Sequence, residues 1–140
     1  MTTLPPSRKF PLVLVVASVS LTVGALAAGA SPWGQSKKDF SVSAHKYGFK
    51  VDGSDKSEIH VQQDDLVRIT FSTEDIPHSF TISEDPYRIM RRAEPGKPVT
   101  FEFRADKAGT FPFKCTLTVD ERCKEMQGVL IVEKSRTSQH

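Results

Sequence analysis

The chain has 140 residues, of which 38% are hydrophobic and 26% are charged, so it has room for one folded domain of ordinary globular composition. Its formal net charge is +2 and its basic residues never form a run longer than two, which argues against nucleic-acid binding. Because it contains only two cysteines, Cys115 and Cys123, it is not a disulfide-built scaffold.

The N-terminal segment is typical of an export signal. Arg8 and Lys9 precede an uncharged, apolar run over residues 10–30, and the small residues Ala28 and Ala30 offer a cleavage site. The same run is long enough to cross a bilayer as a helix. Residues 1–30 are therefore predicted to be either a cleaved signal peptide or an anchor helix that contacts the membrane through residues 10–30. In both cases the rest of the chain is expected to be periplasmic or extracellular, and in the second it stays anchored to the cytoplasmic membrane.

A polar linker over residues 31–39 is predicted next, then a domain over residues 40–134 and a tail over residues 135–140. Within the domain, apolar and polar residues alternate over short runs separated by turn residues, as in half-buried strands. The alternating runs are 58–62, 67–71, 79–82, 99–104 and 111–113, and the run 129–132 is continuously apolar. This pattern predicts an all-β fold, namely a sandwich of two antiparallel sheets with Greek-key connections.

Strand parity brings chemically reactive side chains to the inner face of this sandwich. His78 and Cys115 each have the parity of the apolar residues in their own strands, so both are expected to point inward. Cys123 and Met126 follow in the loop before the last strand. Thiolate and thioether ligands select Cu(I), and imidazole, thiolate and methionine together make up copper electron-transfer sites. The sequence therefore predicts a copper site.

Four motifs and a single cysteine carry a resemblance to a known family. They are, in chain order, Asp75-Ile76-Pro77-His78-Ser79-Phe80, Glu94-Pro95-Gly96-Lys97, Ala105-Asp106-Lys107-Ala108-Gly109-Thr110-Phe111, Cys115, and Met126-Gln127-Gly128-Val129-Leu130-Ile131-Val132. In these motifs the chain resembles the copper-binding domain of cytochrome c oxidase subunit II and its relatives among the cupredoxins. The resemblance implies a cupredoxin-like sandwich, a copper cofactor, and His78, Cys115 and Met126 as ligands.

The ligand loop departs from the family pattern at two positions. The family's two-copper centre has the loop Cys-x-x-x-Cys-x-x-x-His-x-x-Met, in which Cys115 and Met126 keep the first and last positions. Val119 stands where the second bridging cysteine would be, and Cys123 stands where the histidine would be. Cys123 joins the predicted ligands from its position, and one copper ion is expected in place of two. Other histidines and carboxylates are not expected to be ligands; these are His45, His60, Glu84, Asp120 and Glu121.

The predicted function is electron transfer or copper handling for a respiratory or related membrane enzyme. The expected partner is a redox or copper-exchange protein, with a membrane oxidase as one candidate, and the chain would then be an accessory or detached subunit of a terminal oxidase. The chain itself is not expected to be an enzyme, because no catalytic triad order, phosphate-binding glycine loop or C-x-x-C pair occurs in it. The alternative is a copper-free module that binds a protein and is stapled by a Cys115–Cys123 disulfide, since an exported domain faces an oxidising compartment.

Overall fold

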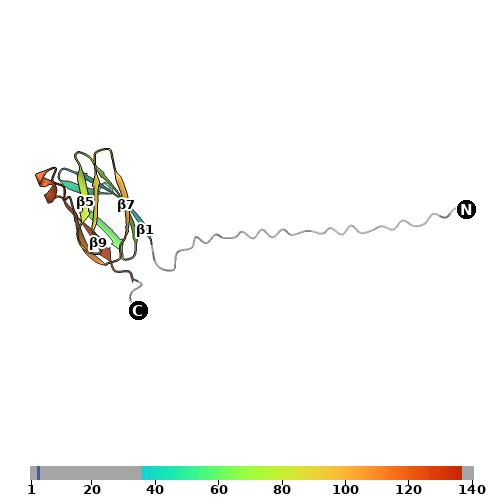
Figure 1. Ribbon diagram of the computed structural model, residues 1–140. Coiled ribbons are helices and arrows are strands. Elements are labelled where there is room, and N and C mark those ends of the chain that lie inside the picture. The colour runs from blue at the N-terminus through green and yellow to red at the C-terminus, as the bar shows by residue number, and fades with distance from the viewer. Residues whose placement is uncertain (1–2, 4–35, 137–140) are drawn as a thin grey trace.

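The computed structural model describes residue 3 and residues 36–136, which form a two-layered β-sandwich with one short 3-10 helix (Figure 1). Apart from residue 3, the predicted signal or anchor lies outside the described residues. So do most of the predicted linker and the last residues of the tail. In the part of the chain that is described, no helix is long and apolar enough to cross a membrane.

Each layer is one sheet. The first sheet has the order β2-β1-β4-β7, with β1 at Lys37–His45, β2 at Gly48–Val51, β4 at Leu66–Thr73 and β7 at Val99–Arg104. The second has the order β3-β9-β8-β5-β6, with β3 at Glu58–Gln62, β9 at Gln127–Glu133, β8 at Gly109–Lys114, β5 at His78–Ile82 and β6 at Ile89–Ala93. The 3-10 helix η1 spans Glu121–Glu125. This architecture confirms the predicted all-β sandwich.

Three details differ from the expectation. The sheets are not purely antiparallel, because β1 pairs with β4 and β3 pairs with β9 in parallel. Strand β1 begins at Lys37, inside the stretch predicted as a linker, because residues 37–40 pair with residues 66–69 of β4. Strand β6 was not predicted at all. Its three central residues, Met90, Arg91 and Arg92, are all exposed, so they show no apolar alternation.

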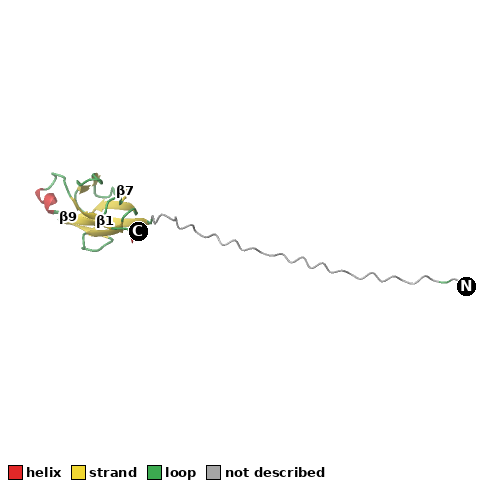
Figure 2. Ribbon diagram, turned by 90° about the horizontal axis from the view of Figure 1, so that it is seen from below, coloured by secondary structure: helices red, strands yellow, loops and turns green. Residues whose placement is uncertain are grey.

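The core between the sheets is built around phenylalanine. Phe80 and Phe113 stack with their ring centroids 4.6 Å apart, and Phe49 meets Phe113 edge-on at 5.1 Å. All three rings are buried, and such pairs add to the free energy gained by burying their area. Because Phe80 lies on β5 and Phe113 on β8, this packing fixes the two strands side by side. Figure 2 shows η1 at one end of the sandwich.

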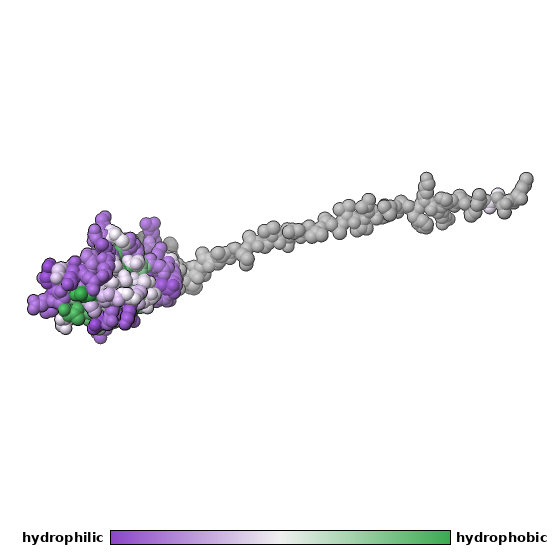
Figure 3. Space-filling model, turned by 90° about the horizontal axis from the view of Figure 1, so that it is seen from above, coloured by the Kyte–Doolittle hydropathy of each residue, from purple (hydrophilic) through white to green (hydrophobic). Residues whose placement is uncertain are grey.

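The outer surface is mostly hydrophilic. Figure 3 shows one face on which polar residues surround a small hydrophobic area. Among the described residues, the large hydrophobic side chains that are exposed are Met90 and Val119.

Candidate metal centre

The four predicted ligands come from three neighbouring segments of the second sheet and its loop. His78 is the first residue of β5, Cys115 directly follows β8, Cys123 lies in η1, and Met126 lies between η1 and β9. All four are buried, with exposed fractions of 0% for His78, Cys123 and Met126 and 2% for Cys115. The inward orientation predicted for His78 and Cys115 is confirmed.

A cluster of hydroxyl groups joins the end of β8 to β5. The backbone N–H of Thr116 donates to Oγ of Ser79 at 2.9 Å. The hydroxyl oxygens of Ser79, Thr81 and Thr116 lie 3.0 to 3.2 Å from one another. Since Thr116 follows Cys115 and Ser79 follows His78, these bonds hold the Cys115 thiol beside the His78 ring.

The helix η1 turns the loop back towards Cys115 and His78. Asp120 caps it, because its Oδ1 accepts from the backbone N–H of Arg122 at 2.9 Å. The carbonyl of Cys123 then accepts from the N–H of Met126 at 3.1 Å, and the carbonyl of Met126 accepts from the N–H of Cys115 at 3.4 Å. These bonds place the backbone of Met126 next to Cys115 and direct the Cys123 side chain into the core.

His78, Cys115 and Cys123 converge on a single point. One ligand atom from each lies within 4.8 Å of the other two, and no other group of three such residues occurs in the described part of the chain. The Sγ atoms of Cys123 and Cys115 lie 3.4 and 3.8 Å from Nδ1 of His78. Two ligands bound to one ion at about 2.0 Å and about 2.3 Å in a tetrahedral arrangement lie about 3.5 Å apart. The spacing therefore fits a shared metal ion.

Asp75 holds the other side of the His78 ring. Its Oδ1 lies 2.8 Å from Nε2 of His78, and its two oxygens also accept from the backbone N–H groups of Ile76 at 2.7 Å and Lys46 at 2.6 Å. Burial raises the pKa of Asp75, but the hydrogen bonds from Ile76, His78 and Lys46 outweigh it and bring the pKa below its ordinary value. The carboxylate is therefore ionised at neutral pH.

The Cys123 thiol is protonated in the metal-free chain. Burial raises the pKa of Cys123 to about 12, and the hydrogen bond and charge of Cys115 and the carboxylates of Asp120 and Asp75 act in the same direction. A metal ion binds the thiolate and displaces the thiol proton. Both cysteines are free. One imidazole nitrogen and two sulfurs fit copper by ligand chemistry.

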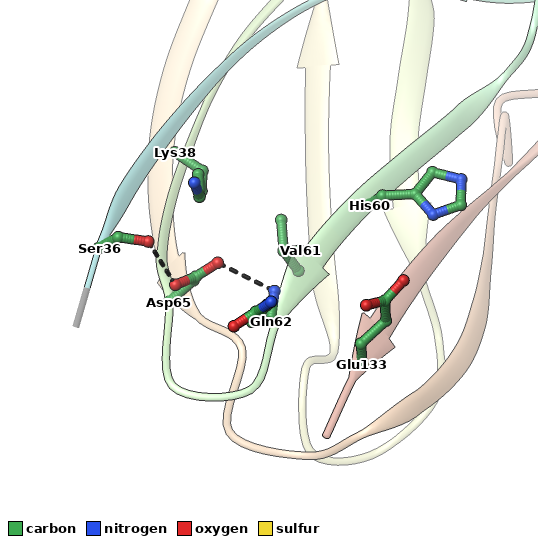
Figure 4. Close-up of a pocket in the computed structure, with 7 residues that line it drawn as sticks. All are labelled: Ser36, Lys38, His60, Val61, Gln62, Asp65 and Glu133. Atoms are coloured by element: carbon green, nitrogen blue, oxygen red, sulfur yellow. Dashed lines mark hydrogen bonds between the residues drawn. The ribbon is translucent and has the colours of Figure 1, made fainter. Parts of the chain in front are cut away.

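The remaining candidates lie outside this cluster. Val119, which stands at the family's second bridging cysteine, is 50% exposed and carries no ligand atom. His60 is exposed and lies 3.0 Å from Oε2 of Glu58. Figure 4 shows the depression beside His60, where both oxygens of the buried Asp65 are already occupied by Ser36 Oγ at 2.7 Å and Gln62 N–H at 2.9 Å.

Two contacts near the site were not predicted. Asp75 opens the motif that contains His78 but was given no role, although ligand histidines commonly donate their second ring N–H to a carboxylate. The guanidinium of Arg122, next to Cys123, lies 3.8 Å from the centroid of the Tyr47 ring. No local pattern predicts this contact, because Tyr47 lies in the β1–β2 turn, far away in sequence.

Comparison with known proteins supports the fold. No protein-family model and no curated protein matches the sequence. A chain of a heme-copper terminal oxidase dimer is 25% identical, with a TM-score of 0.60 over 71% of this chain and 66% of that chain. The periplasmic domain of subunit II of cytochrome oxidase (CoxB) of Bradyrhizobium japonicum is 15% identical, with a TM-score of 0.60 over 71% of this chain and 86% of that domain.

A third match is subunit II of cytochrome c oxidase in its mixed disulfide intermediate with thioredoxin-like TlpAs. It is 15% identical, with a TM-score of 0.56 over 69% of this chain and 81% of that chain. Multicopper oxidases are also among the matches. The fold is therefore cupredoxin-like and similar to the periplasmic domain of oxidase subunit II, as the resemblance in sequence implied. This chain spans slightly less than two thirds of the oxidase-dimer chain, at 66%.

Proposed function

We propose that this chain is an extracytoplasmic copper-binding cupredoxin that transfers electrons or handles copper for a respiratory or related membrane enzyme. The observation that carries the proposal is the convergence of the Cys115 and Cys123 sulfurs on Nδ1 of His78. The cluster lies inside a cupredoxin-like fold similar to oxidase subunit II. In this proposal the chain is an accessory or detached subunit, and another chain performs the catalysis.

Among these roles, the ligands favour copper handling. Two thiolates and the thioether of Met126 are soft donors, which stabilise Cu(I) over Cu(II). Bound copper would supply one-electron chemistry, and His78, Cys115, Cys123 and Met126 would hold it. The partner would be a protein that exchanges copper or electrons with this site. The solved complex of subunit II with a thioredoxin-like protein supports a redox partner.

The decisive experiment is metal analysis combined with thiol titration on the natively purified protein. We expect bound copper and two protected thiols that react once the copper is removed. Zinc in place of copper would contradict the choice of metal, because a tetrahedral site of sulfur and nitrogen ligands also suits Zn²⁺. No metal and no reactive thiol would instead favour the module stapled by a Cys115–Cys123 disulfide.

The site is expected to bind one copper ion per chain. Val119, at the position of a bridging cysteine, is half exposed and carries no ligand atom, and Cys123 stands in place of the loop histidine. The cluster therefore offers a single imidazole, and both of its thiols lie beside Nδ1 of that ring. Copper quantified on the reconstituted protein should saturate at about one equivalent, and the electron paramagnetic resonance spectrum should show no mixed-valence signal. Two coppers per chain with a delocalised mixed-valence signal would contradict this stoichiometry.

The domain is expected to lie outside the cytoplasmic membrane. Arg8, Lys9 and the apolar run over residues 10–30 form the targeting segment. A reporter active only in the cytoplasm, fused to the C-terminus of the full chain, should therefore give no signal. The same fusion without residues 1–30 is the control and should be active. Activity of the full-length fusion would rule out export.

A further inference from the structure

The two nitrogens of the His78 ring have different partners. Both cysteine sulfurs lie near Nδ1, whereas Nε2 lies 2.8 Å from Oδ1 of Asp75. A neutral imidazole carries one hydrogen, so the nitrogen that keeps it cannot bind a metal, and the other nitrogen has the free lone pair. The partner of Nε2 therefore decides whether Nδ1 is available.

Asp75 can only accept at this contact. Both of its oxygens accept from backbone N–H groups, those of Ile76 and Lys46, so the hydrogen at the contact with His78 lies on Nε2. This leaves the lone pair of Nδ1 directed at the two thiols. The ring itself is completely buried, so no solvent molecule competes for Nε2 at the protein surface.

The carboxylate is itself fixed by the backbone. The N–H of Ile76 donates to Oδ1 and the N–H of Lys46 donates to Oδ2, at 2.7 and 2.6 Å. Lys46 lies in the β1–β2 turn, whose next residue, Tyr47, contacts Arg122 beside Cys123. The same turn therefore supports both the segment that carries His78 and the segment that carries Cys123.

We propose that Asp75 is a positioning residue for the metal centre, and that it holds His78 in the tautomer whose Nδ1 lone pair faces the sulfurs of Cys115 and Cys123. This inference deepens the proposed function, because it assigns the metal-binding nitrogen of that site. Outer partners of this kind orient ligand histidines and raise the basicity of the ligand nitrogen.

The test compares Asp75→Ala and Asp75→Asn with Glu74→Ala. Glu74 is the neighbouring exposed carboxylate, which accepts from Ser43 Oγ at 3.3 Å, so its removal changes the charge equally without touching the His78 ring. The first readout is the nitrogen-15 spectrum of the His78 imidazole in metal-free, reduced protein, which distinguishes the two tautomers. The second is Cu(I) affinity by competition with a chromogenic chelator.

The wild-type protein should show hydrogen on Nε2. In Asp75→Ala the Nδ1–H tautomer should appear, and the Cu(I) affinity should fall by about 10- to 100-fold. Asp75→Asn keeps an oxygen that can accept from Nε2 but loses the acceptor for the N–H of Lys46, so it should retain the wild-type tautomer and lose less affinity than Asp75→Ala. Glu74→Ala should match the wild type in both readouts.

Hydrogen on Nδ1 in the wild-type protein would overturn the inference, and so would an unchanged tautomer in Asp75→Ala. The wild-type spectrum is recorded on the metal-free protein. It therefore decides which nitrogen carries the hydrogen even if a variant folds poorly or the wild-type protein binds no copper. A chain that shows the expected tautomer but binds no copper would contradict the proposed function and leave the role of Asp75 in orienting His78 intact.

Discussion

Replacing Gly128 by alanine is expected to lower the free energy of unfolding by about 3 kcal/mol. An added Cβ would overlap Cζ and Cε2 of the Phe113 ring and lie 2.7 Å from the backbone oxygen of Ser57. Neither neighbour can yield. Phe113 is completely buried against Phe80, and the Ser57 oxygen accepts from the N–H of Val129 at 2.8 Å. For a domain of this size the melting temperature should fall by roughly 10 to 20 °C.

Gly48→Ala is the matched control for this variant. A Cβ at Gly48 would lie 3.5 Å from Cε1 of His45, which is an ordinary van der Waals contact. Its effect should stay within about 0.5 kcal/mol. Thermal unfolding followed by circular dichroism measures both variants. Equal melting temperatures for Gly128→Ala and Gly48→Ala would show that Phe113 does not pack on Gly128 in solution.

The sequence predicted the strands whose two faces differ in polarity. Alternation along β4 and β7 follows from the backbone itself, because successive side chains point to opposite faces. Strand β5 has the same alternation in sequence but is buried along its whole length. The same rule correctly placed His78 and Cys115 inside. It failed for β6, where Met90, Arg91 and Arg92 are all exposed on an edge strand. The parallel pairing of β1 with β4 is a contact between distant segments, and local periodicity contains no information about it.

Part of the candidate site was also predictable. Cys123 was predicted because it stands at the histidine position of the family's ligand loop, and the structure brings its sulfur to 3.4 Å from Nδ1 of His78. That approach depends on the turn made by η1 and on its Asp120 cap. The function of Asp75 depends on the distance between two side-chain atoms and on a backbone N–H from the distant β1–β2 turn. Neither quantity is encoded in a local pattern, so only the three-dimensional structure reveals it.

Cys115→Ser is expected to bring Cu(I) binding below detection. The Cys115 thiol is buried beside His78, and a hydroxyl is a poor ligand for a soft ion. His78→Ala and Met126→Ala should weaken binding by smaller amounts, because two sulfurs of the cysteines remain in each. Competition with a chromogenic Cu(I) chelator measures all three variants. Full Cu(I) binding by Cys115→Ser would show that the Cys115 thiolate is not a copper ligand.

Cys123→Ser separates the metal site from the disulfide. If both thiols hold copper, this variant loses Cu(I) affinity, while the melting temperature of the metal-free protein changes little. If Cys115 and Cys123 instead form a disulfide, the variant loses roughly 2–3 kcal/mol of stability under oxidising conditions, because the short loop is no longer closed by a covalent bond. The free thiols and their contacts with Nδ1 of His78 favour the first outcome. Melting temperatures with and without reductant, together with Cu(I) affinity, distinguish the two. Unchanged affinity beside a large fall in melting temperature would assign Cys123 to a disulfide.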